Sequence, residues 1–138
     1  MDLLVVGLVH WLHVFFGVFW FGTILYTRLI LFPSLRTLPK EQEQAVRQAM
    51  LTGRGRQFTM LFAYGTVIMG TIRGAMAGVF GRLDTPYGIT YLASLLIGVA
   101  LLIYLFAPLP WSHPVLPKLY VWAFPVMFTL MVLMRFGY

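Results

Sequence analysis

The sequence contains no cysteine, and only four of its 138 residues are acidic. The absence of cysteine excludes disulfides, iron–sulfur clusters, thiolate zinc sites and cysteine nucleophiles. A metal bound by this chain would therefore need histidine, methionine, tyrosine, carboxylate or backbone ligands. Charged residues make up 10% of the chain and apolar residues 60%, which excludes an ordinary soluble domain.

Long apolar stretches occupy most of the chain. Four of them, at 3–32, 58–80, 87–107 and 118–136, are long enough to cross a bilayer core of about 30 Å, which needs about 20 helical residues. We therefore predict an all-α polytopic membrane protein, a single domain over 1–138 in which four transmembrane helices form an antiparallel bundle. A short amphipathic surface helix is expected in the first loop, over KEQEQAVRQAML after Pro39.

The basic residues predict the orientation of the chain in the membrane. The second connection holds only Arg82, offset by Asp84, whereas the first connection holds five basic residues: Arg36, Lys40, Arg47, Arg54 and Arg56. Loops rich in lysine and arginine stay in the cytoplasm. We expect a multi-pass protein of the cell (inner) membrane with a cytoplasmic first loop and both termini outside. The basic residues that give the net charge of +6 are then expected to set the topology and to contact lipid headgroups. No nucleic acid is expected as a partner.

The first predicted helix carries a line of histidine and small or polar residues. His10, His13, Gly17 and Trp20 follow steps of three and four residues, so they share one helix face. Polar side chains within a bilayer face the interior of the protein or a cavity. Both imidazoles are therefore expected to point inward.

Counting the helical rise places further candidates at the depth of these histidines. Arg73 and Met76 fall in the outer half of the second predicted span, Tyr91 in the third and Met131 in the fourth. The second span also holds Gly70, Gly74 and Gly78 at four-residue spacing, preceded by Gly65. This glycine series predicts close backbone packing, and a dimer face or room for a flat cofactor are its alternatives.

Three chemistries fit this set of residues. A b-type haem would take His13 or His10 as one ligand, Met76 or Met131 opposite, the glycines for a flat slot, and Arg73 near its propionates. A copper site would combine imidazole and thioether ligands from His10, His13 and the methionines. A quinone or proton site would use histidine and tyrosine alone. Because His10 and His13 lie on the same side of one helix, they cannot provide both axial ligands to one haem iron. One of them could bind the iron while the other binds a propionate, or the pair could chelate a metal. Of these, we expect His13 to be the primary ligand and His10 to lie at a second site or at a propionate.

The segment LHVFFGVFWFGTILYTRLILFP carries His13, Trp20, Gly22, Tyr26 and Arg28. This pattern resembles the first helix of CopD-like copper-resistance membrane proteins and of the related HemJ-type protoporphyrinogen oxidases. The resemblance implies that His13 binds b-type haem or takes part in copper handling. HemJ-type enzymes carry a further histidine and a lysine early in the third span, and YGITYLASLL has neither, so protoporphyrinogen oxidase activity is not expected.

The sequence therefore predicts a haem b membrane protein with a role in electron transfer or redox sensing rather than substrate turnover. The predicted cofactor-binding residues are His13, His10, Gly17, Trp20, Arg73 and Tyr91, and the predicted metal ligands are His13, His10, Met76 and Met131. A copper-handling protein and a non-catalytic subunit of a larger membrane complex are the alternatives. Expected partners are the lipid bilayer and a homo-oligomer or larger complex.

Overall fold

The computed structural model describes residues 2–106 and 116–137, and every regular element in these ranges is a helix. The predicted all-α class is confirmed. The long helices are α1 (Leu3–Leu25), α4 (Arg54–Met76), α5 (Pro86–Phe106) and α6 (Leu116–Arg135). The shorter elements are the π-helix η1 (Tyr26–Leu31), α2 (Phe32–Leu35), α3 (Lys40–Thr52) and the 3-10 helix η2 (Val79–Gly81).

Three helical stretches of the described residues are long and apolar enough to cross a membrane: Leu3–Leu35, Pro86–Leu105 and Lys118–Arg135. These three stretches confirm the prediction of a membrane protein with transmembrane helices. Helix α4 lies where the second span was predicted at 58–80, but it is not one of these three stretches. It is less apolar because it opens with two arginines, contains Arg73 and is rich in glycine and threonine.

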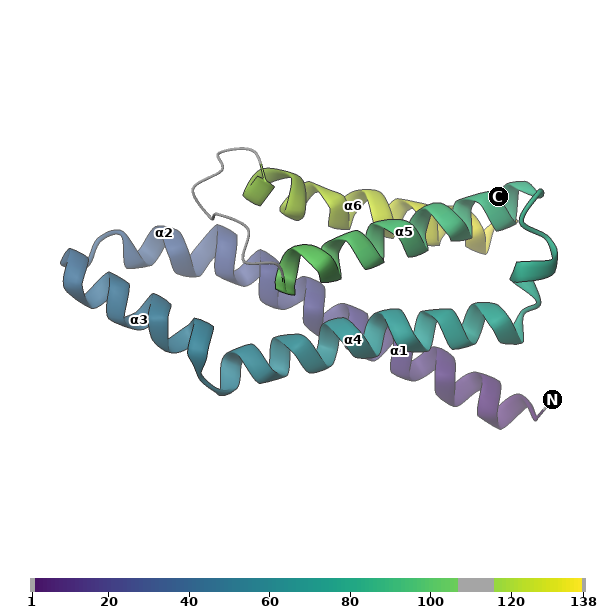
Figure 1. Ribbon diagram of the computed structural model, residues 1–138, viewed down its shortest axis with the longest axis horizontal. Helices are drawn as coiled ribbons and strands as arrows, with labels where there is room; N and C mark the ends of the chain where they lie inside the picture. Colours follow the sequence, from purple (N-terminus) through teal and green to yellow (C-terminus); the bar gives the residue numbers. More distant parts are fainter. Residues whose placement is uncertain (1, 107–115, 138) are drawn as a thin grey trace.

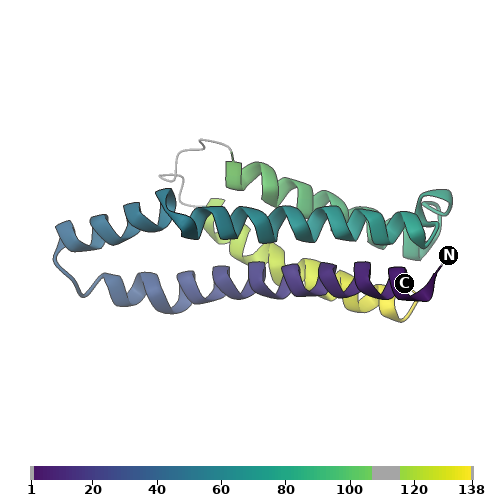
Figure 2. The same ribbon diagram turned by 90° about the horizontal axis from the view of Figure 1, so that it is seen from below.

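The long helices pack in two pairs. Helix α1 packs along α4, and α5 packs along α6, while smaller contacts join α4 to α5 and α1 to α6. Successive long helices run in opposite directions, so the start of α1 and the end of α6 lie at the same end of the molecule (Figures 1 and 2). The turn between α2 and α3 lies at the opposite end (Figure 1).

The first helix continues without a break through η1 and α2. Its 33 residues span about 50 Å at about 1.5 Å per residue, whereas the 20 residues of α6 span about 30 Å. The excess length projects with α3 beyond the ends of α5 and α6 (Figure 1). The amphipathic helix predicted in the first loop is present as α3, which starts directly after Pro39.

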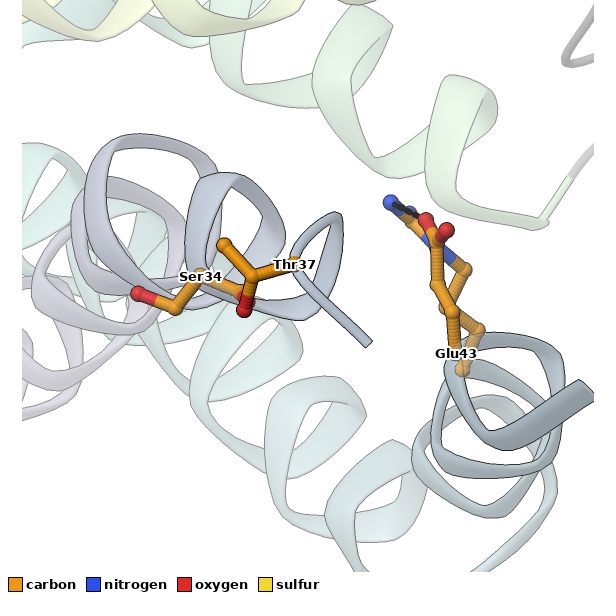
Figure 3. Close-up of polar contacts among 4 residues, drawn as sticks. Ser34, Thr37 and Glu43 are labelled. Atoms are coloured by element: carbon orange, nitrogen blue, oxygen red, sulfur yellow. Dashed lines mark hydrogen bonds and ion pairs between the residues drawn. The ribbon is translucent and has the colours of Figure 1, made fainter. Parts of the chain in front are cut away.

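Polar contacts at the projecting end are local (Figure 3). Arg47 and Glu43, one turn apart on α3, form an ion pair of 2.7 Å. The Arg47 guanidinium also lies 4.1 Å from the centre of the Phe32 ring, which links α3 to α2. At the end of α2, the Thr37 hydroxyl donates a hydrogen bond to the Ser34 carbonyl oxygen.

The hydrophobic core lies between the helix pairs and is small. Its buried side chains come from α1, α4, α5 and α6: Trp20, Ile24, Ala63, Leu101, Tyr120, Phe124 and Met127. All four long helices also expose large apolar side chains on their outer faces. A small buried core with an apolar exterior is the arrangement expected when lipid rather than water surrounds the helices.

Helix α4 ends at Met76, earlier than the predicted limit of residue 80. Two residues later, Gly78 takes a φ of 67°, in the left-handed region. Glycine adopts this conformation without a steric penalty, and it commonly ends a helix in this way. Gly78 therefore terminates α4, and it does not continue the helical glycine series that its spacing predicted.

Replacing Gly78 with alanine is expected to lower the free energy of unfolding by about 1 kcal/mol, because a left-handed conformation costs residues with a side chain about this much. Thermal unfolding followed by circular dichroism in detergent measures the change. Gly81→Ala is the matched control, since its added Cβ meets nothing within 4 Å and its φ is not positive. Equal losses for the two variants would contradict the assignment of Gly78 as the end of α4.

Candidate functional site

His13 lies on α1 and faces α4. Its Nδ1 atom lies 2.8 Å from the backbone carbonyl oxygen of Thr66. A carbonyl oxygen only accepts hydrogen bonds, so Nδ1 carries the proton and donates it. The neutral ring then keeps its lone pair on Nε2, which is the nitrogen able to bind a metal ion.

Gly70 on α4 makes room for the His13 ring. An added Cβ at Gly70 would lie 2.7 Å from Cε1 and 3.0 Å from Nδ1 of His13. These distances are shorter than normal van der Waals contact between carbon or nitrogen atoms. The imidazole therefore rests directly on the glycine backbone, and this close approach lets Nδ1 reach the Thr66 carbonyl oxygen.

The same type of contact recurs along α4. An added Cβ at Gly65 would overlap the Phe16 ring of α1, and one at Gly74 would overlap the Tyr91 ring of α5. The predicted close packing of the glycine series is thus present at Gly74, as it is at Gly70. The backbone of α4 is in contact with aromatic or imidazole rings from both neighbouring helices.

Tyr91 reaches α4 from the side of α5. Its hydroxyl donates a hydrogen bond to the carbonyl oxygen of Gly70 over 3.3 Å. His13 and Tyr91 therefore bond carbonyl oxygens that are one turn apart on α4, those of Thr66 and Gly70. The structure brings these two predicted site residues to the same stretch of α4. Arg73 follows in the last turn of that helix and is partly buried.

His10 and Gly17 differ from His13 in their surroundings. The His10 side chain is exposed on α1, so the prediction that both imidazoles point inward is wrong for His10. Residues three apart share a face only roughly, and α4 covers the part of that face that holds His13. Gly17 faces α4, where an added Cβ would lie 3.6 Å from Cγ2 of Thr66, an ordinary contact distance. Of the two histidines, His13 is the one whose ring orientation is fixed by a described hydrogen bond to another helix.

Trp20 lies in the hydrophobic core rather than beside the His13 ring. It is fully buried, and its ring meets the Phe124 ring of α6 edge to face with centroids 5.0 Å apart. Seven residues separate Trp20 from His13, which is about 10 Å along the helix axis.

The two candidate methionine ligands occupy different places. Met131 on α6 packs against the core cluster that contains Trp20. Met76 is the last residue of α4 and is partly buried. Within residues 2–106 and 116–137, no three histidine, aspartate or glutamate side chains come together as a metal site. The roles predicted for the methionines stay predictions.

Two groups that contact predicted site residues were not predicted from the sequence: the Thr66 carbonyl oxygen beside His13, and Tyr120 beside Trp20. The Thr66 carbonyl oxygen is a backbone group, so no residue type in the sequence marks it. Tyr120 of α6 lies in the core with Trp20, and no pattern in the sequence singled it out. His113, which the sequence places in the loop between the third and fourth predicted spans, lies outside the described residues.

The chain matches no protein-family model, no curated protein and no solved structure.

Proposed function

We propose that this chain is an integral membrane protein that binds b-type haem, with Nε2 of His13 as the iron ligand. Its role is electron transfer or redox sensing. The hydrogen bond from Nδ1 of His13 to the Thr66 carbonyl oxygen carries the proposal. Such a bond fixes the tautomer and the ring orientation of a ligating histidine and increases the basicity of the other nitrogen.

The donor chemistry at His13 fits haem with one protein ligand. A neutral imidazole is the group that holds haem iron from the proximal side in many haem proteins. His13 presents this group in a defined orientation, between α1 and α4. When bound, the iron would supply reversible one-electron transfer, and the chain would hold it and tune its potential through the His13–Thr66 bond.

Other residues are assigned roles around His13. Tyr91 and Arg73 lie on the adjacent turns of α5 and α4, where a phenol and a cation can bind anionic propionates. Met76 or Met131 would supply a second protein ligand. His10, three residues from His13 on the same helix, would remain outside this ligand set.

The proposed topology completes this assignment. Helix α4 is included as a fourth span because α1 and α5 both pack on it, which shields its polar stretch from lipid. The four long helices then form an antiparallel bundle. The projecting α2–α3 end, with Arg36, Lys40 and Arg47, is cytoplasmic by the distribution of basic residues. Both termini are outside.

The resemblance of the first helix to CopD-like and HemJ-type proteins agrees with this proposal. It points to the same residue, His13, as the haem or copper ligand. The resemblance and the His13–Thr66 hydrogen bond are separate observations, because the first comes from sequence letters and the second from packing between α1 and α4.

The absorption spectrum of the purified protein tests the proposal. We expect a Soret band and reduced α and β bands in the wild type and in His10→Ala, and their loss in His13→Ala. His10→Ala is the matched control because His10 is the same residue type one turn away but is exposed. Circular dichroism should show that both variants retain their helices.

Two other results would reject haem and select an alternative. A colourless protein that contains copper by metal analysis, lost in His13→Ala, would favour a copper-handling protein. A colourless protein without copper would favour a non-catalytic subunit in which His13 only joins α1 to α4.

A further inference from the structure

Four basic residues lie near the end of the bundle from which α2 and α3 project: Arg28, Arg54, Arg56 and Lys118. We refer to these four residues as the cation layer. Arg28 belongs to η1, Arg54 and Arg56 to the first turn of α4, and Lys118 to the start of α6. The side chains of Arg54, Arg56 and Lys118 are exposed, and Arg28 is partly buried over the Phe32 ring.

Contacts between α1 and α4 place Arg28 level with two of the other cations. His13 lies against Gly70, and the two helices run antiparallel (Figure 2). Arg28 is fifteen residues after His13, and the position fifteen residues before Gly70 falls between Arg54 and Arg56. Because both helices rise about 1.5 Å per residue, the three arginines lie at nearly the same depth.

Contacts between α1 and α6 place Lys118 at this depth as well. The Phe21 ring stacks on the Phe124 ring with centroids 5.4 Å apart. Toward the projecting end, Arg28 is seven residues from this contact along the first helix, and Lys118 is six residues from it along α6. Both cations therefore lie about 10 Å beyond the contact.

The cation layer coincides with one boundary of the hydrocarbon core. Helix α5 has 21 residues and α6 has 20, so each is about 30 Å long, which matches the thickness of that core. Lys118 at the start of α6 then marks the boundary. Leu119 follows it, and Phe58 follows Arg56 by two residues; both apolar side chains are more than half exposed. Headgroups therefore meet the cations where acyl chains meet these apolar side chains.

The sequence supplies no acidic side chain to the cation layer. Its four acidic residues are Asp2, Glu41, Glu43 and Asp84. Asp2 precedes α1 and Asp84 precedes α5, so both belong to the opposite end of the bundle. Glu43 forms an ion pair of 2.7 Å with Arg47, and Glu41 lies in the first turn of α3. The negative charge that balances the layer therefore comes from outside the chain.

We propose that the cation layer binds the headgroups of anionic phospholipids and selects them over zwitterionic phosphatidylcholine. Arginine and lysine form charge-assisted hydrogen bonds with phosphate oxygens. Basic residues next to membrane helices attract anionic headgroups, and this attraction decreases within a Debye length. The site concerns the lipids around the bundle, and it does not depend on the proposed haem.

Arg36 and Lys40 provide a comparison within the same chain. Arg36 is eight residues beyond Arg28, which is about 12 Å further from the core along the helix axis, and Lys40 follows it at the start of α3. The Debye length is about 10 Å at 0.1 M salt. These two cations have the same charge as members of the layer, but we expect them to contribute little to lipid selection.

Trp122 reports on the lipid beside Lys118, because it lies one turn further along α6 and is 69% exposed. The experiment uses a Trp11→Phe, Trp111→Phe background, in which the other remaining tryptophan, Trp20, is fully buried. The chain is placed in phosphatidylcholine nanodiscs at 0.1 M salt that contain either brominated phosphatidylglycerol or the same fraction of brominated phosphatidylcholine. Bromine quenches the fluorescence of a tryptophan that it contacts. We expect stronger quenching of Trp122 by the brominated phosphatidylglycerol.

Two single variants assign this preference to a position. Lys118→Gln should lower the affinity for phosphatidylglycerol relative to phosphatidylcholine by about fivefold, the effect of removing one cation at the membrane surface. Lys40→Gln removes the same charge at the projecting end and should leave the relative affinity unchanged. Circular dichroism should show that both variants retain their helices.

Two double variants test the rest of the layer. Electron paramagnetic resonance of spin-labelled phosphatidylglycerol measures the fraction of this lipid that is immobilised on the protein. Arg54→Gln with Arg56→Gln should lower that fraction, whereas Arg36→Gln with Lys40→Gln should not, although each pair removes two charges. Equal quenching of wild-type Trp122 by the two brominated lipids, or equal losses in the two double variants, would overturn the proposal.

Discussion

Trp20→Ala is expected to lower the free energy of unfolding by about 3 kcal/mol, as removal of a large buried aromatic side chain does in other proteins. Trp20 is fully buried and belongs to the core cluster with Phe124 and Ala63, so it connects α1 to α6 and α4. In a bilayer this loss comes mainly from packing, since lipid is as apolar as the core. Unfolding of the protein in mixed micelles with an increasing fraction of denaturing detergent measures this loss of stability.

Trp122→Ala is the matched control for this prediction. Trp122 is 69% exposed on α6, so its removal leaves no cavity between helices. We expect the free energy of unfolding to change by no more than about 0.5 kcal/mol, as for most surface substitutions. Similar losses for the two variants would contradict a core built around Trp20.

Gly70→Ala is expected to separate His13 from Thr66 and to abolish the proposed haem binding. The added Cβ would lie 2.7 Å from Cε1 of His13, so the ring must turn away and its Nδ1 hydrogen bond must break. Overpacking of this kind typically lowers the free energy of unfolding by about 1–3 kcal/mol. The higher helix propensity of alanine offsets about 1 kcal/mol of that loss. Haem content per chain and the free energy of unfolding measure the two effects separately.

Gly22→Ala provides the comparison for Gly70→Ala. Gly22 is also inside a helix, and its added Cβ would meet nothing within 4 Å. This variant should keep the proposed haem binding and should be as stable as the wild type or slightly more stable. If Gly70→Ala behaved like Gly22→Ala, the contact between His13 and α4 would not control the site.

The all-α class was predictable from the long apolar runs. Inside a membrane, backbone N–H and C=O groups must form hydrogen bonds within the protein, and a single apolar run of this length can do so as a helix. The helix in the first loop was also predictable from Pro39 and the amphipathic KEQEQAVRQAML. The end of α4 was not, because the repeat of Gly70 and Gly74 continues to Gly78 in the sequence, while the left-handed φ of Gly78 appears only in three dimensions.

The candidate site was only partly predictable for a related reason. The spacing of His10 and His13 on one helix face predicted that both imidazoles point inward, but His10 is exposed, and His13 is the one that bonds another helix. That choice depends on Gly70, which is 57 residues away in the sequence from His13 and directly against it in space. The Trp20–Tyr120 pair likewise joins residues from opposite ends of the chain, and single-helix periodicity contains no information about such pairs.

The central claim is that Nε2 of His13 holds a haem iron. Imidazole rescue of His13→Gly tests it most directly, because free imidazole can occupy the space of the missing side chain and replace its nitrogen. We predict that His13→Gly is purified without haem, and that imidazole together with added haem restores the wild-type spectrum at one haem per chain. A His13→Gly protein that retains the wild-type spectrum without imidazole, or a wild-type protein that binds no haem, would contradict the claim.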